Sequence, residues 1–192
     1  SHDQQALEIC EGKRLLENYS QSDVLGFRAP GYHTHQSLQS ILKNSKHTYE
    51  TSAFPCIPYY VAKSMVLSWM KVRGKKSKSI MGNPSVLLAP TQPYWADPKH
   101  PYRMINPLQE TDAMPHCPIS VTKGIPLIGT AFSALGQLSK YVCQYTLYDM
   151  QESDHLTLEF HAADLLSVTE DQLDVGLQVQ PDLKLSWHTK LK

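Results

Sequence analysis

The sequence has no excess charge of either sign and no long hydrophobic run. Its 192 residues contain 18 Lys or Arg and 18 Asp or Glu, so the formal net charge is zero. This balance argues against bulk nucleic-acid binding, which needs a basic surplus to displace counterions. The longest apolar runs, 86–89 and 125–128, are far shorter than the roughly 18 residues of a membrane-spanning helix. We therefore expect neither a nucleic-acid partner nor a transmembrane segment.

Cysteine is scarce and is not arranged as a known site. The four cysteines lie at positions 10, 56, 117 and 143, and no two of them form a Cys-x-x-Cys pair. A zinc knuckle, a thioredoxin-type site and a disulfide scaffold are therefore not expected, and we predict free, mostly buried thiols. Hydrophobic residues make up 41% of the chain and charged residues 19%, which indicates a globular protein. The length suits a single domain over residues 1–192.

Predicted strands alternate with predicted helices along the chain. Hydrophobic periodicity predicts helices over 4–19, 60–72 and 131–143, with another around Leu38–Leu42. Short apolar segments at 24–27, 49–53, 119–122 and 156–161 predict strands. This order indicates an α/β fold with a parallel sheet, in which ligands gather at the carboxyl ends of the strands.

Residues 82–118 are rich in Pro, Tyr and Trp and predict a long insertion loop with one strand at 86–89. Its aromatic side chains would either stack on sugar rings or pack on the domain itself.

The helix predicted over 60–72 has two notable features. Its apolar residues fall on one face at the helical period, namely Val61, Ala62, Met65, Val66 and Trp69. A basic run follows, made of Lys71, Arg73, Lys75, Lys76 and Lys78. The run suits a solvated helix end, where cations complement the helix dipole. Alternatively, it grips an anionic substrate or surface.

Three groups of polar residues are candidates for a site. Arg28 directly follows a predicted strand, where it would either form a salt bridge across the sheet or hold a catalytic carboxylate ionised. His161 ends another strand and is either a satisfied half-buried side chain or a functional one, and Asp164 could orient it or cap the next segment. His33 and His35 have metal-compatible spacing, but they lack a third ligand nearby and are interpreted as a loop pair.

Several segments together resemble the polysaccharide deacetylase (NodB-homology, carbohydrate esterase family 4) family. Residues 26–32, Gly-Phe-Arg-Ala-Pro-Gly-Tyr, are similar to the family's third motif. Residues 158–161, Leu-Glu-Phe-His, resemble its final Leu-x-x-His motif. Residues 49–55 resemble its Tyr-Asp-Ser-Ser stretch, with Glu50 in place of Asp, and 118–122 resemble a later core strand. Gly31 stands where many members carry an aromatic residue.

The resemblance implies a metal-dependent amide hydrolase built on a distorted (β/α)7 barrel. The family binds a divalent cation, commonly zinc, through one Asp and two His, and a second Asp acts as the base. No first motif is present here, so the resemblance implies a barrel that is incomplete at its N-terminus and a chain that is inactive alone. His2 would be the second histidine of the second motif and hence a metal ligand; alternatively, it is an expression-vector remnant.

The resemblance also assigns roles to further residues. Arg28 would keep the base ionised, and His161 would protonate the departing amine. Pro30, Tyr32 and Ser52 would bind the substrate, a carbohydrate or glycolipid with an N-acetyl amide. We expect Arg28, His161 and His2 to converge on one cleft, with Ser52 and Asp164 close by. The alternative is a degenerate homologue that binds carbohydrate or acts as a scaffold without catalysis. The compartment and the oligomeric state stay open.

Overall fold

The computed structural model describes residues 2–74, 81–108, 112–151, 155–174, 176–177 and 181–190. These residues form two compact units, Ser1–Ile119 and Ser120–Lys192, and each unit is described by itself. A single domain over residues 1–192 therefore stays a prediction. Three lysines of the predicted basic run, at 75, 76 and 78, lie outside the described residues.

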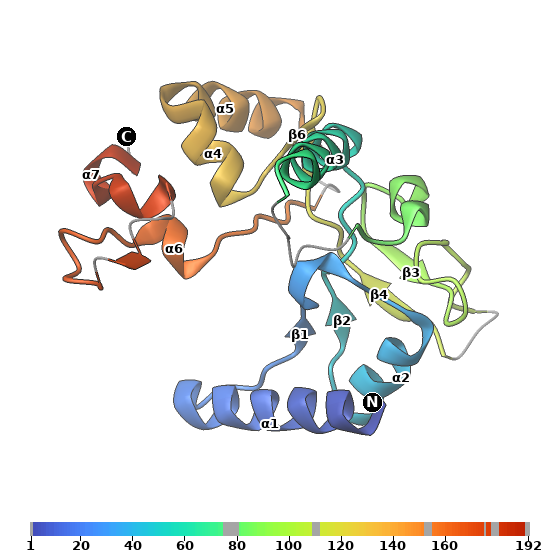
Figure 1. The fold of residues 1–192 in the computed structure, drawn as a ribbon. Helices are drawn as coiled ribbons and strands as arrows, with labels where there is room; N and C mark the ends of the chain where they lie inside the picture. The colour runs from blue at the N-terminus through green and yellow to red at the C-terminus, as the bar shows by residue number, and fades with distance from the viewer. Residues whose placement is uncertain are drawn as a thin grey trace. The chain divides into compact units, whose positions relative to one another are not determined.

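The first unit is a mixed α/β structure, as the alternation of elements predicts. Its elements are α1 (His2–Ser20), β1 (Gly26–Phe27), η1 (Pro30–Tyr32), α2 (Gln36–Asn44), β2 (Tyr49–Glu50), α3 (Ile57–Val72), η2 (Pro84–Leu88), β3 (Tyr94–Ala96) and β4 (Met114–His116). The sheet has the order β1-β2-β4-β3, in which β1, β2 and β4 run parallel and β3 pairs antiparallel with β4 (Figure 1). Over the described residues this sheet is open and does not close into a barrel.

The segment 82–118 is more regular than the long insertion loop with one strand that its composition predicts. It supplies β3 and β4, two of the four strands of the sheet. In each of these strands the two outer residues are buried and the middle residue is not. This alternation is typical of a strand with one buried face, but prolines obscure the alternation in the sequence. The strand expected at 86–89 is instead part of η2, because Pro84 begins a helical turn that the Asn83 side chain caps.

The main core of the first unit lies where α1 and α2 pack side by side next to the strands (Figure 1). Its buried residues come from both helices and from the sheet: Ile9, Ala29, Leu38, Ile41, Leu42 and Met114. A second cluster joins α3 to η2 through Tyr60, Val86, Ala89 and Tyr102. The periodic apolar residues Leu38, Ile41 and Leu42 thus form the buried face of α2, whereas in α1 Ile9 is buried and Leu16 is exposed.

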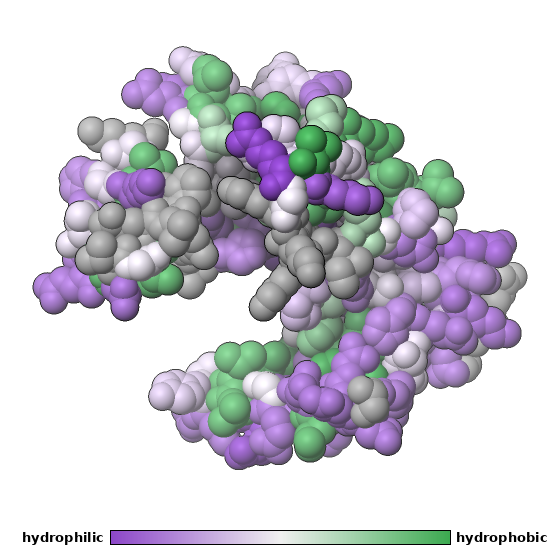
Figure 2. Space-filling view, viewed as in Figure 1, coloured by the Kyte–Doolittle hydropathy of each residue, from purple (hydrophilic) through white to green (hydrophobic). Residues whose placement is uncertain are grey.

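Helix α3 confirms the helix predicted over 60–72 and begins three residues earlier. Gly74 ends it with a positive φ of 67°, a conformation that glycine adopts without steric cost. Tyr60 is buried, whereas Val61, Met65 and Trp69 on the apolar face are exposed. Figure 2 shows hydrophobic residues at the surface over α3, beside strongly hydrophilic ones.

The second unit consists mainly of short helices. Strands β5 (Val121–Thr122) and β6 (Ile125–Pro126) form a hairpin, followed by α4 (Gly129–Leu135), η3 (Gly136–Leu138), α5 (Ser139–Asp149), α6 (Ala162–Leu165), η5 (Pro181–Lys184) and α7 (Trp187–Lys190). The helix predicted over 131–143 is interrupted at Gly136, whose φ is 53°. The strand predicted over 156–161 is reduced to one parallel bridge between Ile128 and Glu159.

Among the residues that the structure describes, no helix has both the length and the hydrophobicity needed to cross a bilayer.

Candidate active site

Arg28 lies just past the carboxyl end of β1, where the loop after β1 is bound to the loop after β2. Its Nε donates a hydrogen bond to Oγ1 of Thr51 at 2.9 Å. The next residue, Ala29, donates its backbone N–H to Oγ of Ser52 at 2.8 Å. Within the described residues no carboxylate forms an ion pair with Arg28. The structure therefore gives no support to a salt bridge across the sheet and leaves the guanidinium on the cleft described next.

A cleft of about 550 Å³ lies between α1 and the end of β1. Residues of α1, including Lys13, line one side, and Arg28 and Pro30 line the other together with His33, His35 and His47. Of the predicted site residues in this unit, Arg28 and Pro30 thus share one cleft. Ser52 is fully buried beneath the Arg28 loop and does not line the cleft, so its role in substrate binding stays a prediction.

Tyr32 ends η1 and belongs to an aromatic cluster. Its ring centroid lies 5.1 Å from that of Phe54 and 6.3 Å from that of Tyr59. Gly31 and Tyr32 have positive φ values of 68° and 65°, a backbone conformation that is uncommon outside glycine. Glycine at position 31 therefore suits this turn. Tyr32 is half-buried and is not among the residues that line the cleft.

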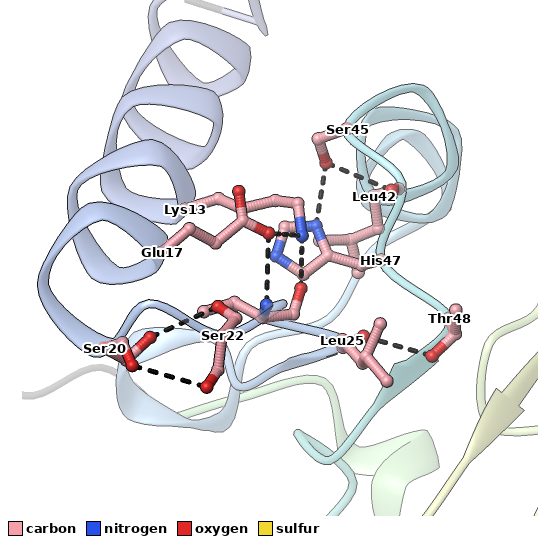
Figure 3. A network of polar contacts seen from close by, with 10 residues as sticks. Lys13, Glu17, Ser20, Ser22, Leu25, Leu42, Ser45, His47 and Thr48 are labelled. Carbon is pink, nitrogen blue, oxygen red and sulfur yellow. Dashed lines mark hydrogen bonds and ion pairs between the residues drawn. The ribbon is translucent and has the colours of Figure 1, made fainter.

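A polar network supports one wall of the cleft by joining α1 to the segments before β1 and β2 (Figure 3). Lys13 Nζ lies 2.6 Å from Oε1 of Glu17 and also donates to the carbonyl of Val24. The N–H of Val24 donates back to Oε1 of Glu17 at 3.1 Å. Buried His47 contacts Ser45 through Nδ1 at 2.8 Å. Burial and the nearby Lys13 lower the pKa of His47, so its neutral ring is favoured.

The described residues do not form a metal site of the expected kind. His2 is exposed in the first turn of α1, with Nδ1 3.7 Å from the carboxylate of Asp3, and it does not line the cleft. His35 contacts Gln5 through Nε2 at 3.2 Å. No group of three or more His, Cys, Asp or Glu in the described ranges could hold a metal ion. A catalytic zinc site uses three protein ligands, so the donors present here do not fit one.

A buried acid–base pair lies at the centre of the sheet, at positions where no local sequence pattern predicts a site. Glu50 on β2 pairs in register with His116 on β4, and their side chains are 3.0 Å apart and fully buried. Thr34 donates to Oε2 of Glu50 at 3.1 Å. Tyr94 gives its proton to the carbonyl of Pro101, so its oxygen faces Nδ1 of His116 as an acceptor at 3.4 Å. Nε2 of His116 also lies 3.2 Å from Nε2 of Gln39, so both ring nitrogens have polar partners.

The ionised form of Glu50 is favoured despite its burial. Desolvation acts to raise the pKa of this carboxyl. The hydrogen bond and the charge of His116, together with hydrogen bonds from Ser52 and Thr34, lower the pKa by more than desolvation raises it. The pKa of Glu50 is therefore lowered from its ordinary value. In the sequence, Glu50 stands out only as the residue that replaces the family's Asp, and His116 has no recognisable pattern.

In the second unit, His161 precedes α6 as its N-cap residue, between two buried carboxylates. Its backbone N–H donates to Oδ2 of Asp164 at 2.6 Å, as part of a capping box. Its ring Nδ1 lies 3.2 Å from Oε1 of Glu159 and 3.7 Å from Oδ2 of Asp164. The His161 side chain itself is 62% exposed. Asp164 therefore caps α6 through the backbone N–H of His161, and its carboxylate also lies near the imidazole ring.

Close packing of Gly129 against Asp164 gives a direct test of this arrangement. A Cβ at Gly129 would overlap the buried Asp164 carboxylate, whereas a Cβ at Gly12 in α1 would meet nothing within 4 Å. We expect Gly129→Ala to lower the free energy of unfolding by about 1–3 kcal/mol through overpacking. Gly12→Ala should instead raise it by about 0.5–1 kcal/mol, because alanine is the better helix former. Urea unfolding measures both, and equal effects would contradict the described packing.

Arg28 belongs to the first unit and His161 to the second, so their convergence on one cleft, together with His2, stays a prediction. No protein-family model, no curated protein and no solved structure matches the chain.

Proposed function

We propose that the chain is the C-terminal bulk of a polysaccharide-deacetylase-type hydrolase, which cleaves an N-acetyl amide on an amino sugar or related carbohydrate. The observation that carries the proposal is the position of Arg28. It lies at the carboxyl end of a parallel strand, held to Thr51 after the neighbouring strand, and it lines a cleft of about 550 Å³. Ligands of parallel α/β sheets bind at such strand ends. On this proposal, β1, β2 and β4 are part of a distorted (β/α)7 barrel.

The chemistry assigns separate tasks to the two candidate catalytic residues. An amide nitrogen leaves only when it takes a proton, which a correctly placed acid supplies. His161 suits this task because its ring is exposed and its Nδ1 lies 3.2 Å from Glu159 and 3.7 Å from Asp164, two carboxylates that can orient the imidazole. Arg28 suits the task of keeping a catalytic carboxylate ionised by opposite charge. A bound divalent metal would supply water activation for such a reaction, but the donors described above do not form its site, and no step is assigned through it.

The metal-ligating side chains of the described residues favour a second candidate function. Since the described residues contain no three-donor group, a homologue that binds carbohydrate without cleaving it is the alternative. The cleft beside Arg28 would then be a sugar-binding site or part of a scaffold.

Acetate release from an N-acetylglucosamine oligomer separates these functions. We expect the 192 residues alone to release acetate at the background rate even with zinc added, because one histidine does not hold zinc tightly. The full-length protein should release acetate in a zinc-dependent manner. Robust zinc-dependent release by the 192 residues would contradict this expectation, and His33 and His35 would be the first substitute ligands to test. Oligomer binding without any release by the full-length protein would establish the second function.

A further inference from the structure

The exposed face of α3 is almost entirely apolar. Ile57, Val61, Met65 and Trp69 are spaced four residues apart and form a row along the helix. Their exposed fractions run from 46% to 63%, and Val72, seven residues after Met65 on the same face, is 87% exposed. We call these five residues the α3 apolar face. The opposite side of the helix faces the cluster around Tyr60, so the α3 apolar face does not serve the core of its own unit.

Basic residues flank this face in the sequence. Residues 51–96 contain six Lys or Arg and no Asp or Glu, although the whole chain has a net charge of zero. Lys71 and Arg73 end the helix, where the Arg73 guanidinium carbon lies 3.9 Å from the centroid of the Trp69 ring. A tryptophan beside a cation at the edge of an apolar surface is typical of the membrane–water interface.

The other exposed apolar helix of this unit has the opposite charge. Helix α1 exposes Leu7 and Leu15, but it carries Glu8, Glu11 and Glu17 among its acidic residues. Its acidic residues outnumber its Lys and Arg, so an anionic partner would be repelled there. Among the helices of the described part of this unit, only α3 combines an exposed apolar row with a flanking sequence that contains Lys and Arg but no Asp or Glu.

We propose that α3 docks on the surface of an anionic lipid bilayer. The helix lies in the plane of the interface, with the α3 apolar face inserted at the level of the acyl boundary and with Lys71 and Arg73 at the headgroups. The inference does not depend on the proposed hydrolase activity, since it rests on exposure and charge alone. It adopts the second interpretation of the basic run, a grip on an anionic surface.

Vesicle flotation tests the proposal with the full chain. We expect the protein to float with vesicles of phosphatidylcholine containing about one third phosphatidylserine, and to float far less with phosphatidylcholine alone. Lys71→Gln combined with Arg73→Gln should weaken binding by about 30-fold, since each basic residue near an anionic surface contributes about fivefold. Met65→Gln combined with Val72→Gln should weaken it at least about tenfold through lost apolar burial.

Matched controls keep the outcome interpretable. Leu7→Gln combined with Leu15→Gln makes the same chemical change on exposed positions of α1 and should leave flotation unchanged. Circular dichroism melting should be the same for all variants, because every substituted side chain is exposed. Failure to bind anionic vesicles, or equal binding by the α3 and α1 variants, would overturn the proposal. So would a dimer that the α3 variants dissociate without a change in flotation, because the face would then belong to a second copy.

Discussion

Replacing His161 with alanine in the full-length protein should lower turnover by roughly 10²–10⁴-fold and leave the bound metal in place. The expected size is that of a general acid. The residue is exposed, and its ring Nδ1 lies beside two carboxylates, Glu159 and Asp164, which can orient the imidazole toward a substrate. Removal of a metal ligand would have a different result, since the metal would be lost with the activity.

Turnover and zinc content therefore need to be measured in parallel on the same preparation. His155→Ala is a matched control, because it removes another exposed histidine from the same unit and should change neither quantity. If His161→Ala loses its zinc together with its activity, His161 is a metal ligand and the general acid lies elsewhere.

Replacing Glu50 with alanine should lower the free energy of unfolding by about 3–5 kcal/mol, the usual cost of removing one partner from a buried ion pair. The substitution leaves His116 buried without its carboxylate partner. Replacing both residues with apolar ones, as in Glu50→Met with His116→Leu, should recover most of the loss, because no unpaired charge is then buried. A double variant no more stable than Glu50→Ala would contradict this account.

The effect of Glu50 should also depend on pH in a defined direction. Because its pKa is lowered from the ordinary value of 4.5, its contribution to stability is fully present above that value and is lost as the pH falls through the lower folded-state pKa. The difference in urea unfolding between the wild-type protein and Glu50→Ala should thus be largest near neutral pH and shrink below pH 4.5. A difference that grows on acidification would show that Glu50 is buried in its neutral form.

How much the sequence predicted depended on whether the signal was local. Helices α1, α2 and α3 follow from apolar residues at the helical period, and all three exist within about three residues of the expected bounds. The pairing of Glu50 with His116 depends on the register of two strands far apart in the sequence, which no local pattern specifies. Strands β3 and β4 were missed because prolines mask their alternation.

Hydrophobic periodicity also identifies the apolar face of a helix without showing whether that face is buried or exposed. The pattern in α3 correctly groups Val61, Met65 and Trp69, but the structure shows that the packed side is the one with Tyr60. For the candidate site, Arg28 and Pro30 line the same cleft. Ser52 instead accepts a hydrogen bond from the Arg28 loop and is buried, and Tyr32 packs on Phe54. A motif names residues near a site, but it does not separate those that line the site from those that support it.

A double-mutant cycle on Arg28 and His161 tests the central claim most directly, namely that the two residues serve one reaction. Residues that act as a unit in one transition state show strongly non-additive losses. In the full-length protein, we predict that Arg28→Ala combined with His161→Ala lowers kcat/KM for acetate release little further than the worse single variant does. Losses that multiply would contradict the claim, because Arg28 and His161 would then act independently.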